Sequence, residues 1–325
     1  MMHQIQHTAL VFFLGAAVMA GSPAHAQYPE RPITLVVPFA PGGGSDTLSR
    51  LIAQKISEQK GVSVVVENRP GGNTTIAARH VARAKPDGYT VLTAIDATMV
   101  FNPVLYKQAP YDPAKDFEPV AMATFMPLVL SVPPDSSIQT VGQWVDSLKK
   151  GQTAYSMYAH GALPGRIAME VISRAAGVAP TPVPFNGSTP ALQAVLGGHV
   201  PVLIDALAPS LPHLKAGKLR PLMVTTKERT PILPQVPSAG EAGFPGVDVA
   251  SWTGFFVPAG TDGAERQWLE DAFVQALSEP TMAAKLRELG MDVTIKRRDE
   301  FKQQIDRDSA RYKQVISDAG LAGTL

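Results

Sequence analysis

Short runs of aliphatic and β-branched residues alternate with longer amphipathic segments from Ile33 onward. The predicted strands span 33–39, 63–68 and 90–95, and the predicted helices between them span 45–60 and 74–84. In the first helix the apolar residues Leu48, Ile52 and Ile56 recur at helical spacing. The strand runs are apolar at successive positions, which is typical of strands buried on both faces. They therefore predict a parallel sheet covered by helices.

The alternation resumes after residues 119–132, a long extended stretch without helical period, which we interpret as a crossover into a second lobe. Predicted helices then span 140–149, 166–176, 188–197 and 209–216, with predicted strands over 153–158, 181–185, 200–206 and 219–226. The proline-rich residues 230–237 begin the return. A strand over 249–258 and helices over 262–278, 280–289 and 298–319 follow.

This order of elements predicts an α/β fold of two lobes, each a mainly parallel sheet flanked by helices, with a ligand cleft between them. The first lobe is expected to be discontinuous, formed by residues 27–125 and 245–325, and the second lobe is formed by residues 126–244. Hydrophobic residues make up 45% of the chain, which is enough for a sizeable core and excludes a disordered protein.

Residues 1–26 have the pattern of a secretory signal peptide. The apolar run over residues 9–20 is too short to span a bilayer, and an A-x-A cleavage site follows at residues 24–26. The residues before the run include no Lys or Arg, which departs from the usual pattern, and a buried N-terminal helix is the alternative. We expect a mature chain that begins at Gln27 and works in the periplasm, without a lipid anchor because there is no cysteine.

The charge balance gives little reason to expect a highly charged partner. The formal net charge is +1, with 29 Lys and Arg against 28 Asp and Glu. The basic run at residues 296–298 is interpreted as a solvated surface turn, and no coherent basic stripe is present, so no nucleic-acid partner is expected. The absence of cysteine excludes disulfides, thiolate zinc sites, iron–sulfur clusters and cysteine nucleophiles.

The segment PFAPGGGSDT, residues 38–47, joins the first predicted strand to the first predicted helix. Three glycines allow a ligand to approach the backbone closely, and the free N–H groups of the following helix favour an anion. The segment matches neither a Walker loop nor G-x-G-x-x-G. A single carboxylate needs only N–H donors and a hydroxyl, which this segment offers. A tight turn with Ser45 or Asp46 as the N-cap, and no ligand, is the alternative.

Other predicted strands also end in small polar residues. These strand ends are residues 71–75, 96–98, 158–162 and 185–189, together with Asp205. In open parallel sheets, ligands bind at the carboxyl ends of strands, so these loops from both lobes are expected to converge on one cleft. Each of them taken alone would also serve as an ordinary turn or helix cap.

The sequence contains no familiar catalytic or metal-binding motif. It lacks a G-x-S-x-G nucleophile elbow and an H-E-x-x-H pair, so neither a catalytic residue nor a metal site is predicted, and no cofactor is expected. A triad of Ser45, His160 and Asp205 stays open as the alternative for a secreted α/β hydrolase.

Five longer motifs cover much of the chain. They are PFAPGGGSDTLSR (38–50), VVVENRPGG (64–72), KPDGYTVL (85–92), YDPAKDFEPV (111–120) and VPFNGSTPALQAVLGGHV (183–200). With these motifs in register, the sequence resembles the periplasmic solute receptors of tripartite tricarboxylate transporters, the TctC or Bug family. The resemblance implies two lobes of the periplasmic-binding type that close on a small carboxylate without catalysis. It also implies membrane transporter subunits as partners, and we expect the receptor itself to be a monomer.

The resemblance further implies which residues form the site. Matching the first carboxylate-holding loop are Phe39, Ala40, Gly43, Gly44, Ser45 and Asp46. At positions that line the cleft in the family stand Thr74, Asp96, Asn186 and Asp205. The facing loop of the second lobe and its flanks add Tyr158, His160, Gly161, Ala162 and Arg166.

Two departures from the family pattern bear on the ligand. Many members read approximately Gly-x-Gly-Thr/Ser-x-x-His in this loop, whereas residues 159–165 place Ala162 at the hydroxyl position and Gly165 at the histidine position, and Phe185 stands where a tyrosine is usual. The walls are therefore more apolar, and we expect an aromatic or dicarboxylic acid with an apolar body to bind better than citrate. His160 or Arg166 would serve a distal polar group. The sequence leaves open whether the receptor serves transport or presents its ligand to a sensor kinase.

Overall fold

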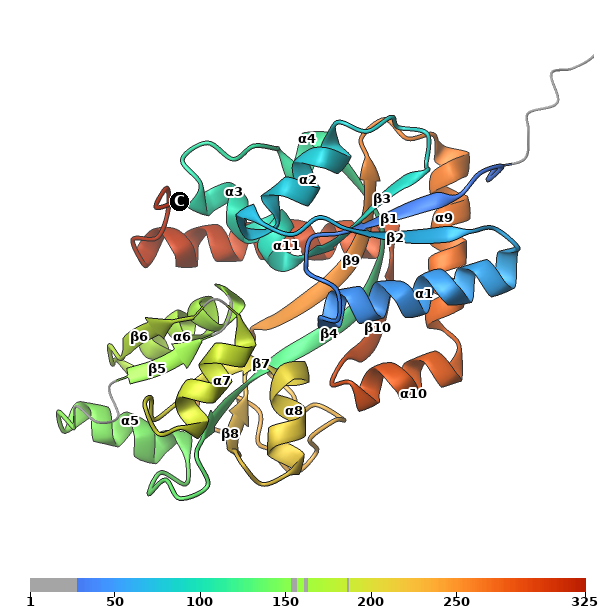
Figure 1. The fold of residues 1–325 in the computed structure, drawn as a ribbon. Coiled ribbons are helices and arrows are strands. Elements are labelled where there is room, and N and C mark those ends of the chain that lie inside the picture. The colour runs from blue at the N-terminus through green and yellow to red at the C-terminus, as the bar shows by residue number, and fades with distance from the viewer. Residues whose placement is uncertain (1–27, 153–156, 161–162, 186) are drawn as a thin grey trace, which may run out of the picture.

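The computed structural model describes residues 28–152, 157–160, 163–185 and 187–325. The predicted signal peptide and its cleavage point before Gln27 lie outside these ranges, as do three candidate site residues, Gly161, Ala162 and Asn186. The chain forms two α/β lobes that lie side by side and are joined by two long strands (Figure 1).

The N-terminal part of the sheet is parallel, as predicted. Strand β1 (Ile33–Val37) lies between β2 (Val64–Asn68) and β3 (Thr90–Ile95) and is parallel to both. The connecting helices α1 (Gly44–Lys60) and α2 (Thr75–Ala82) cover opposite faces (Figure 1). Successive residues of β1 are buried on alternate faces, so Leu35 packs in the cluster that contains α1, and Val36 packs in the cluster that contains α2.

Two strands carry the chain between the lobes. The sixteen-residue strand β4 (Phe117–Val132) pairs antiparallel with β9 (Ala250–Pro258), which is buried along its whole length. Strand β9 is also antiparallel to β3, and β10 (Asp292–Arg297) is antiparallel to β4. The sheet of this lobe is therefore mixed rather than mainly parallel, because the chain leaves along β4 and returns along β9 in the opposite direction.

The second lobe repeats the alternation on a smaller scale. Its strands are β5 (Met157–His160), β6 (Thr181–Pro184), β7 (Leu203–Ala206) and β8 (Arg220–Val224), and its helices are α5 (Val141–Lys149), α6 (Leu163–Ala176), α7 (Ser188–Leu196) and α8 (Leu207–Lys215). Strand β5 is parallel to β6 and β7, whereas β7 and β8 are antiparallel to β4. The sheet order is β2-β1-β3-β9-β4-β7-β5-β6.

The C-terminal segment returns to the first lobe. Helices α9 (Gly263–Leu277) and α10 (Pro280–Glu288) precede β10, and α11 (Arg298–Asp318) lies across the first lobe, next to α6 of the second (Figure 1). An ion pair of 2.8 Å between Arg174 of α6 and Asp318 of α11 links the lobes there. Among the described residues, no helix combines the length and the apolar character that crossing a bilayer requires.

Several short elements were not predicted. They are the 3-10 turn Gly72–Thr74, the π-helix Ala97–Phe101, α3 (Asn102–Leu105), α4 (Pro113–Asp116) and β10. The helices among them have no more than five residues, too few for a helical period to show. Strand β10 is half-buried and mixes apolar and charged residues, so it lacks the continuous apolar run by which the other strands were recognised.

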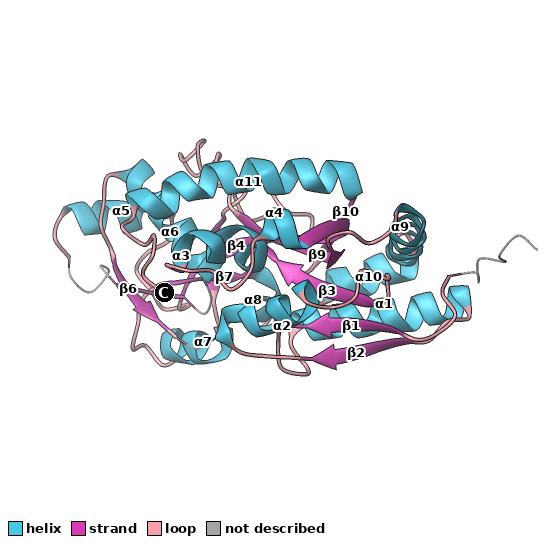
Figure 2. Cartoon of the chain, turned by 90° about the horizontal axis from the view of Figure 1, so that it is seen from above, coloured by secondary structure: helices cyan, strands magenta, loops and turns pink. Residues whose placement is uncertain are grey.

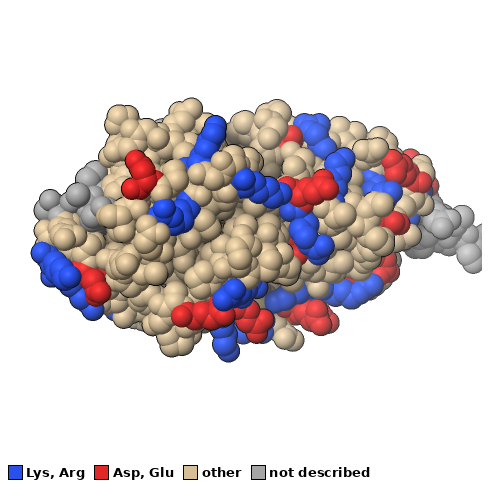
Figure 3. All heavy atoms as spheres, turned by 90° about the horizontal axis from the view of Figure 1, so that it is seen from below, with Lys and Arg blue, Asp and Glu red and all other residues tan. Residues whose placement is uncertain are grey.

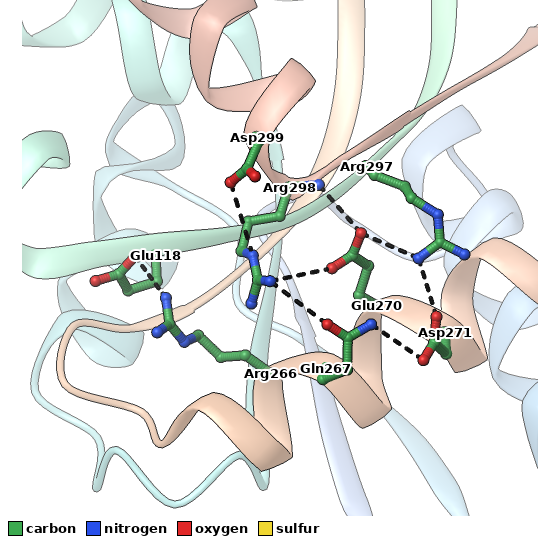
Figure 4. A network of polar contacts seen from close by, with 8 residues as sticks. All are labelled: Glu118, Arg266, Gln267, Glu270, Asp271, Arg297, Arg298 and Asp299. Atoms are coloured by element: carbon green, nitrogen blue, oxygen red, sulfur yellow. Dashed lines mark hydrogen bonds and ion pairs between the residues drawn. The ribbon is translucent and has the colours of Figure 1, made fainter.

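The basic run at residues 296–298 is not the solvated turn that was expected. It spans the junction of β10 and α11, where both arginines pair with Glu270, whose side chain is 5% exposed (Figure 4). The ion-pair distances are 3.2 Å from Arg297 and 3.8 Å from Arg298, and Arg297 also pairs with Asp271 at 2.9 Å. The basic run therefore joins α9 to α11. On the face of the molecule drawn in Figure 3, Lys and Arg are interspersed with Asp and Glu.

We expect Glu270→Gln to lower the free energy of unfolding by about 1–3 kcal/mol, because the buried carboxylate loses charge-assisted hydrogen bonds. Urea denaturation at neutral pH measures the change. The matched control is Asp271→Asn on the same helix, where the carboxylate is 52% exposed and screened by water, so it is expected to cost about 0.5 kcal/mol or less. Equal effects of the two substitutions would contradict the role of Glu270.

Candidate ligand-binding site

The loop after β1 leads into a helix whose first turn is uncapped. The N-cap residue of α1 is Gly43, which has no side chain to accept a hydrogen bond. The first backbone bond of the helix runs from Thr47 N to Gly43 O at 2.9 Å, so the N–H groups of Gly44, Ser45 and Asp46 precede the helical ladder. These glycines and Ala40 are exposed. Free donors at the positive end of a helix dipole form an anion site.

Asp46 holds this loop in shape. Its Oδ2 accepts hydrogen bonds from Gly42 N at 2.8 Å and Arg50 Nε at 3.0 Å, and its Oδ1 accepts from Asn68 Nδ2 at 2.8 Å. Asn68 Nδ2 also donates to Phe39 O at 2.9 Å. Burial acts to raise the pKa of Asp46, but the hydrogen bonds from these partners outweigh it and lower the pKa. The Asp46 carboxylate therefore stays ionised and is engaged within the protein.

The loop after β2 has an unusual backbone. Four consecutive residues have positive φ: Gly71 (116°), Gly72 (57°), Asn73 (50°) and Thr74 (76°). For the two residues with side chains this conformation is strained, and such strain persists only where neighbours hold it. Here the buried Asn102 holds it, because its Nδ2 donates to Asn73 O at 2.7 Å and to Thr74 Oγ1 at 3.2 Å. Strain of this kind is concentrated at functional sites.

Asp96 directly follows β3 and is 1% exposed. Its Oδ1 accepts from Ala97 N at 2.9 Å and from Ser251 Oγ at 2.8 Å, whereas its Oδ2 has no hydrogen-bond partner within the described residues. Burial raises the pKa of Asp96 to about 7, and the nearby Asp308 adds to the increase. A buried carboxyl with one free oxygen is able to donate a hydrogen bond when protonated.

Asp205 has the same features in the second lobe. It lies in β7, is 1% exposed, and its Oδ1 accepts from Ala206 N at 2.9 Å. Its Oδ2 also lacks a partner in the described part of the chain. Burial raises the pKa of Asp205 to about 6, with the Ser188 hydroxyl acting in the opposite direction.

The strand register places these two acids at the junction of the lobes. Asp205 lies opposite Val129 of β4, and Ser251, the partner of Asp96, lies opposite Met126 of the same strand. Strands β9 and β4 lie between β3 and β7 in the sheet. The two acids therefore flank the pair of strands that connects the lobes.

The remaining candidate residues lie in the second lobe. Tyr158 and His160 belong to β5. Arg166 lies in the first turns of α6 and forms an ion pair of 2.6 Å with Glu170, one helical turn further on. A cavity of about 420 Å³ lies at the opposite end of β1 from the glycine loop, and it includes none of the candidate residues. In the described ranges, no group of three or more His, Asp or Glu is arranged to hold a metal ion.

Sequence reasoning missed three supporting residues. Asn68 and Arg50 hold Asp46, and Asn102 holds the strained turn before α2. The sequence signal that could have identified Asn68 is its position as a polar residue at the end of an apolar strand. Asn102 follows a π-helix that the sequence did not predict, so no comparable signal was present.

Comparison with known proteins decides the family. The family model described as the tripartite tricarboxylate transporter family receptor, TctC, matches residues 48–321. The chain belongs to the TctC family. A UPF0065 protein of Bordetella bronchiseptica is 33% identical over 320 residues, which cover 98% of this chain and 95% of the relative. The family predicted from the sequence motifs is confirmed.

Solved structures of TctC-type proteins agree with the two-lobed fold. Rpa4515 of R. palustris, determined with adipate, has a TM-score of 0.82 and 36% identity, covering 91% of this chain and 99% of that one. MatC of Rhodopseudomonas palustris, determined with bound malate, has a TM-score of 0.77 and 33% identity, covering 89% and 100%. The predicted periplasmic-binding fold is confirmed, and the family's role is that of a receptor.

Proposed function

We propose that this TctC protein is an extracytoplasmic solute receptor that binds a small carboxylate between its lobes and delivers it, as a monomer, to a tripartite tricarboxylate-type membrane transporter. The observation that carries the proposal is the uncapped first turn of α1, with three N–H groups held open by the Asp46 network. An anion bound there takes the place of the missing cap and interacts with the helix dipole.

We place the division between the lobes near residues 125 and 245. In this proposal the first lobe comprises residues 27–125 and 245–325, and the second comprises residues 126–244. The support is a change of strand partners along β4, where Pro127 still pairs with Ala250 of β9 and Leu128 pairs with Ala206 of β7. Asp96 and Asp205 lie on either side of this change.

We infer that the ligand is a carboxylic acid with an apolar body, and that a second carboxyl group is favourable. Phe39 and Phe185, one from each lobe, are half-buried and offer ring surface to such a body. Asp96 and Asp205, when protonated, would each donate one hydrogen bond to a distal carboxylate. The acids found in the related structures, adipate and malate, have two carboxyl groups.

A thermal-shift screen tests this assignment. We expect adipate, phthalate and benzoate to raise the melting temperature more than citrate, because the hydroxyl of citrate finds no partner against apolar walls. At a ligand concentration of 100 Kd the stabilisation is about 2.7 kcal/mol, which such a screen detects easily. A larger shift with citrate would contradict the apolar pocket, and no shift with any carboxylate would contradict the receptor assignment.

We also propose that the protein reaches the periplasm through cleavage of residues 1–26. Expression of the full chain in a Gram-negative host is expected to give a periplasmic product whose N-terminal residue is Gln27. N-terminal sequencing of that fraction checks this result. A periplasmic product that still begins at Met1 would contradict it, and Ala26→Trp, which blocks the A-x-A site, provides the control for cleavage.

A further inference from the structure

A second concave surface lies on the first lobe, beside α2. This groove of about 350 Å³ is lined by Arg69, Ile76, Arg79, His80, Arg83 and Ala84 and is called the α2 groove here. Arg69 directly follows β2, the edge strand of the sheet, and the other residues belong to α2 or the turn after it. Figure 2 shows β2 at the margin of the molecule. None of the lining residues belongs to the ligand-binding site.

The groove concentrates positive charge that the protein itself leaves unneutralised. Arg79 on α2 and Arg83, the C-cap residue of that helix, are exposed and lie four residues apart, which is one helical turn. In the described part of the chain neither has a hydrogen bond or ion pair, whereas Arg69 pairs with Glu67 at 2.5 Å. Two like charges at this spacing destabilise a helix slightly. The chain as a whole is nearly neutral, with a formal net charge of +1, so this pair is a local concentration of positive charge.

The same surface exposes apolar side chains and strand edge. Ile76, which lines the groove, is 44% exposed, and Val65, the second residue of the edge strand β2, is 48% exposed. Because β2 pairs only with β1 in the described sheet, the N–H and C=O groups of its outer edge are open to another strand. Exposed apolar groups beside unpaired arginines are typical of a protein-binding surface.

We propose that the α2 groove docks an acidic, extended segment of a protein partner. Carboxylates of that segment pair with Arg79 and Arg83, and an apolar side chain beyond the carboxylate that pairs with Arg79 covers Ile76. A concave surface with an apolar floor fits a peptide better than the flat surface of a membrane. The proposal rests on the proposed receptor function in one respect, which is that a receptor must contact a protein partner. It does not depend on the ligand site itself, since the groove and that site share no residue.

The test uses the full mature protein and a synthetic eight-residue peptide of alternating Glu and Val, labelled with fluorescein. Fluorescence anisotropy is expected to show binding at low salt that weakens as ionic strength rises. The double substitution Arg79→Glu/Arg83→Glu is expected to weaken binding by about tenfold or more. Ile76→Ser is expected to weaken it by about threefold without any change of charge.

The matched control is Lys149→Glu/Lys150→Glu, at two exposed lysines at the end of α5 in the second lobe. It changes the net charge by the same amount and is expected to leave peptide binding unchanged. Equal binding by wild type and Arg79→Glu/Arg83→Glu overturns the proposal. Binding of phosphatidylglycerol vesicles or inorganic phosphate, without binding of the peptide, also overturns it. The adipate-induced thermal shift of the same samples reports folding and receptor function separately.

Discussion

Gly43→Val is expected to abolish carboxylate binding while the protein stays folded. The backbone of Gly43 has φ of −76° and ψ of 169°, an extended conformation that valine adopts readily. A Cβ built there meets only Ala40 O, at an ordinary distance of 3.7 Å. The branched side chain instead stands in front of the N–H groups of the first turn of α1. Losing about two charge-assisted hydrogen bonds weakens binding by roughly a hundredfold or more.

Calorimetry with adipate measures this loss. Ser45→Ala is expected to cost about 1–2 kcal/mol, since it removes one hydroxyl and leaves the backbone donors in place. The control is Gly263→Val at the start of α9, where a Cβ meets no atom within 4 Å and the first turn is already capped by Asp262. That variant should bind as wild type does. Unchanged affinity in Gly43→Val would place the carboxylate elsewhere.

The glycine loop was predictable because its chemistry is local. Three glycines between an apolar strand and an amphipathic helix indicate an uncapped helix N-terminus, and neighbouring residues in the chain form all of it. The residues that hold the loop were not predictable in the same way. The amide of Asn68 lies 22 residues from Asp46 in sequence, and only the pairing of β1 with β2 brings them together.

The buried acids show more clearly that contacts between residues far apart in the sequence could not be predicted from it. Asp96 was a candidate because it follows a strand, but its partner Ser251 lies 155 residues away on β9. The antiparallel pairing of β3 with β9 creates that contact, and the sequence pattern predicted a mainly parallel sheet. Burial, and therefore the raised pKa of Asp96, depends on this long-range pairing rather than on the residues next to it.

The arrangement of strands and helices was largely predictable, since continuous apolar runs and helical periods recur through the chain. Strand β10 was not, because Val293 and Ile295 alternate with polar residues at a partly exposed edge. The role of Arg297 was also not predictable. Its partner Glu270 belongs to α9, and nothing near either residue in the sequence indicates that they meet.

Asp96→Asn is expected to stabilise the unliganded protein at pH 8 by on the order of 2–4 kcal/mol. Burial raises the pKa of Asp96 to about 7, whereas an aspartate in an unfolded chain titrates near about 3.9. The folded state therefore holds this proton more tightly than the unfolded state does. The stabilisation that follows is fully present below about pH 4 and is lost as the pH rises through 7, where folding must bury a charged carboxylate. The neutral amide avoids that cost.

Urea denaturation of the wild type and Asp96→Asn at pH 5 and pH 8 measures the effect. The difference between the two proteins should be clearly larger at pH 8 than at pH 5, because about 1.4 kcal/mol accompanies each unit of pKa change and pH 5 lies only about one unit above the pKa of the unfolded chain. Asp205→Asn should act in the same direction over a narrower range, since burial raises the pKa of Asp205 to about 6. Asp299→Asn, whose carboxylate is 91% exposed, is the control, and its small effect should be the same at pH 5 and pH 8. An Asp96→Asn protein that is equally destabilised at both pH values would show that the ionised carboxylate supports the fold, and that its free Oδ2 is not kept at the lobe junction for a ligand.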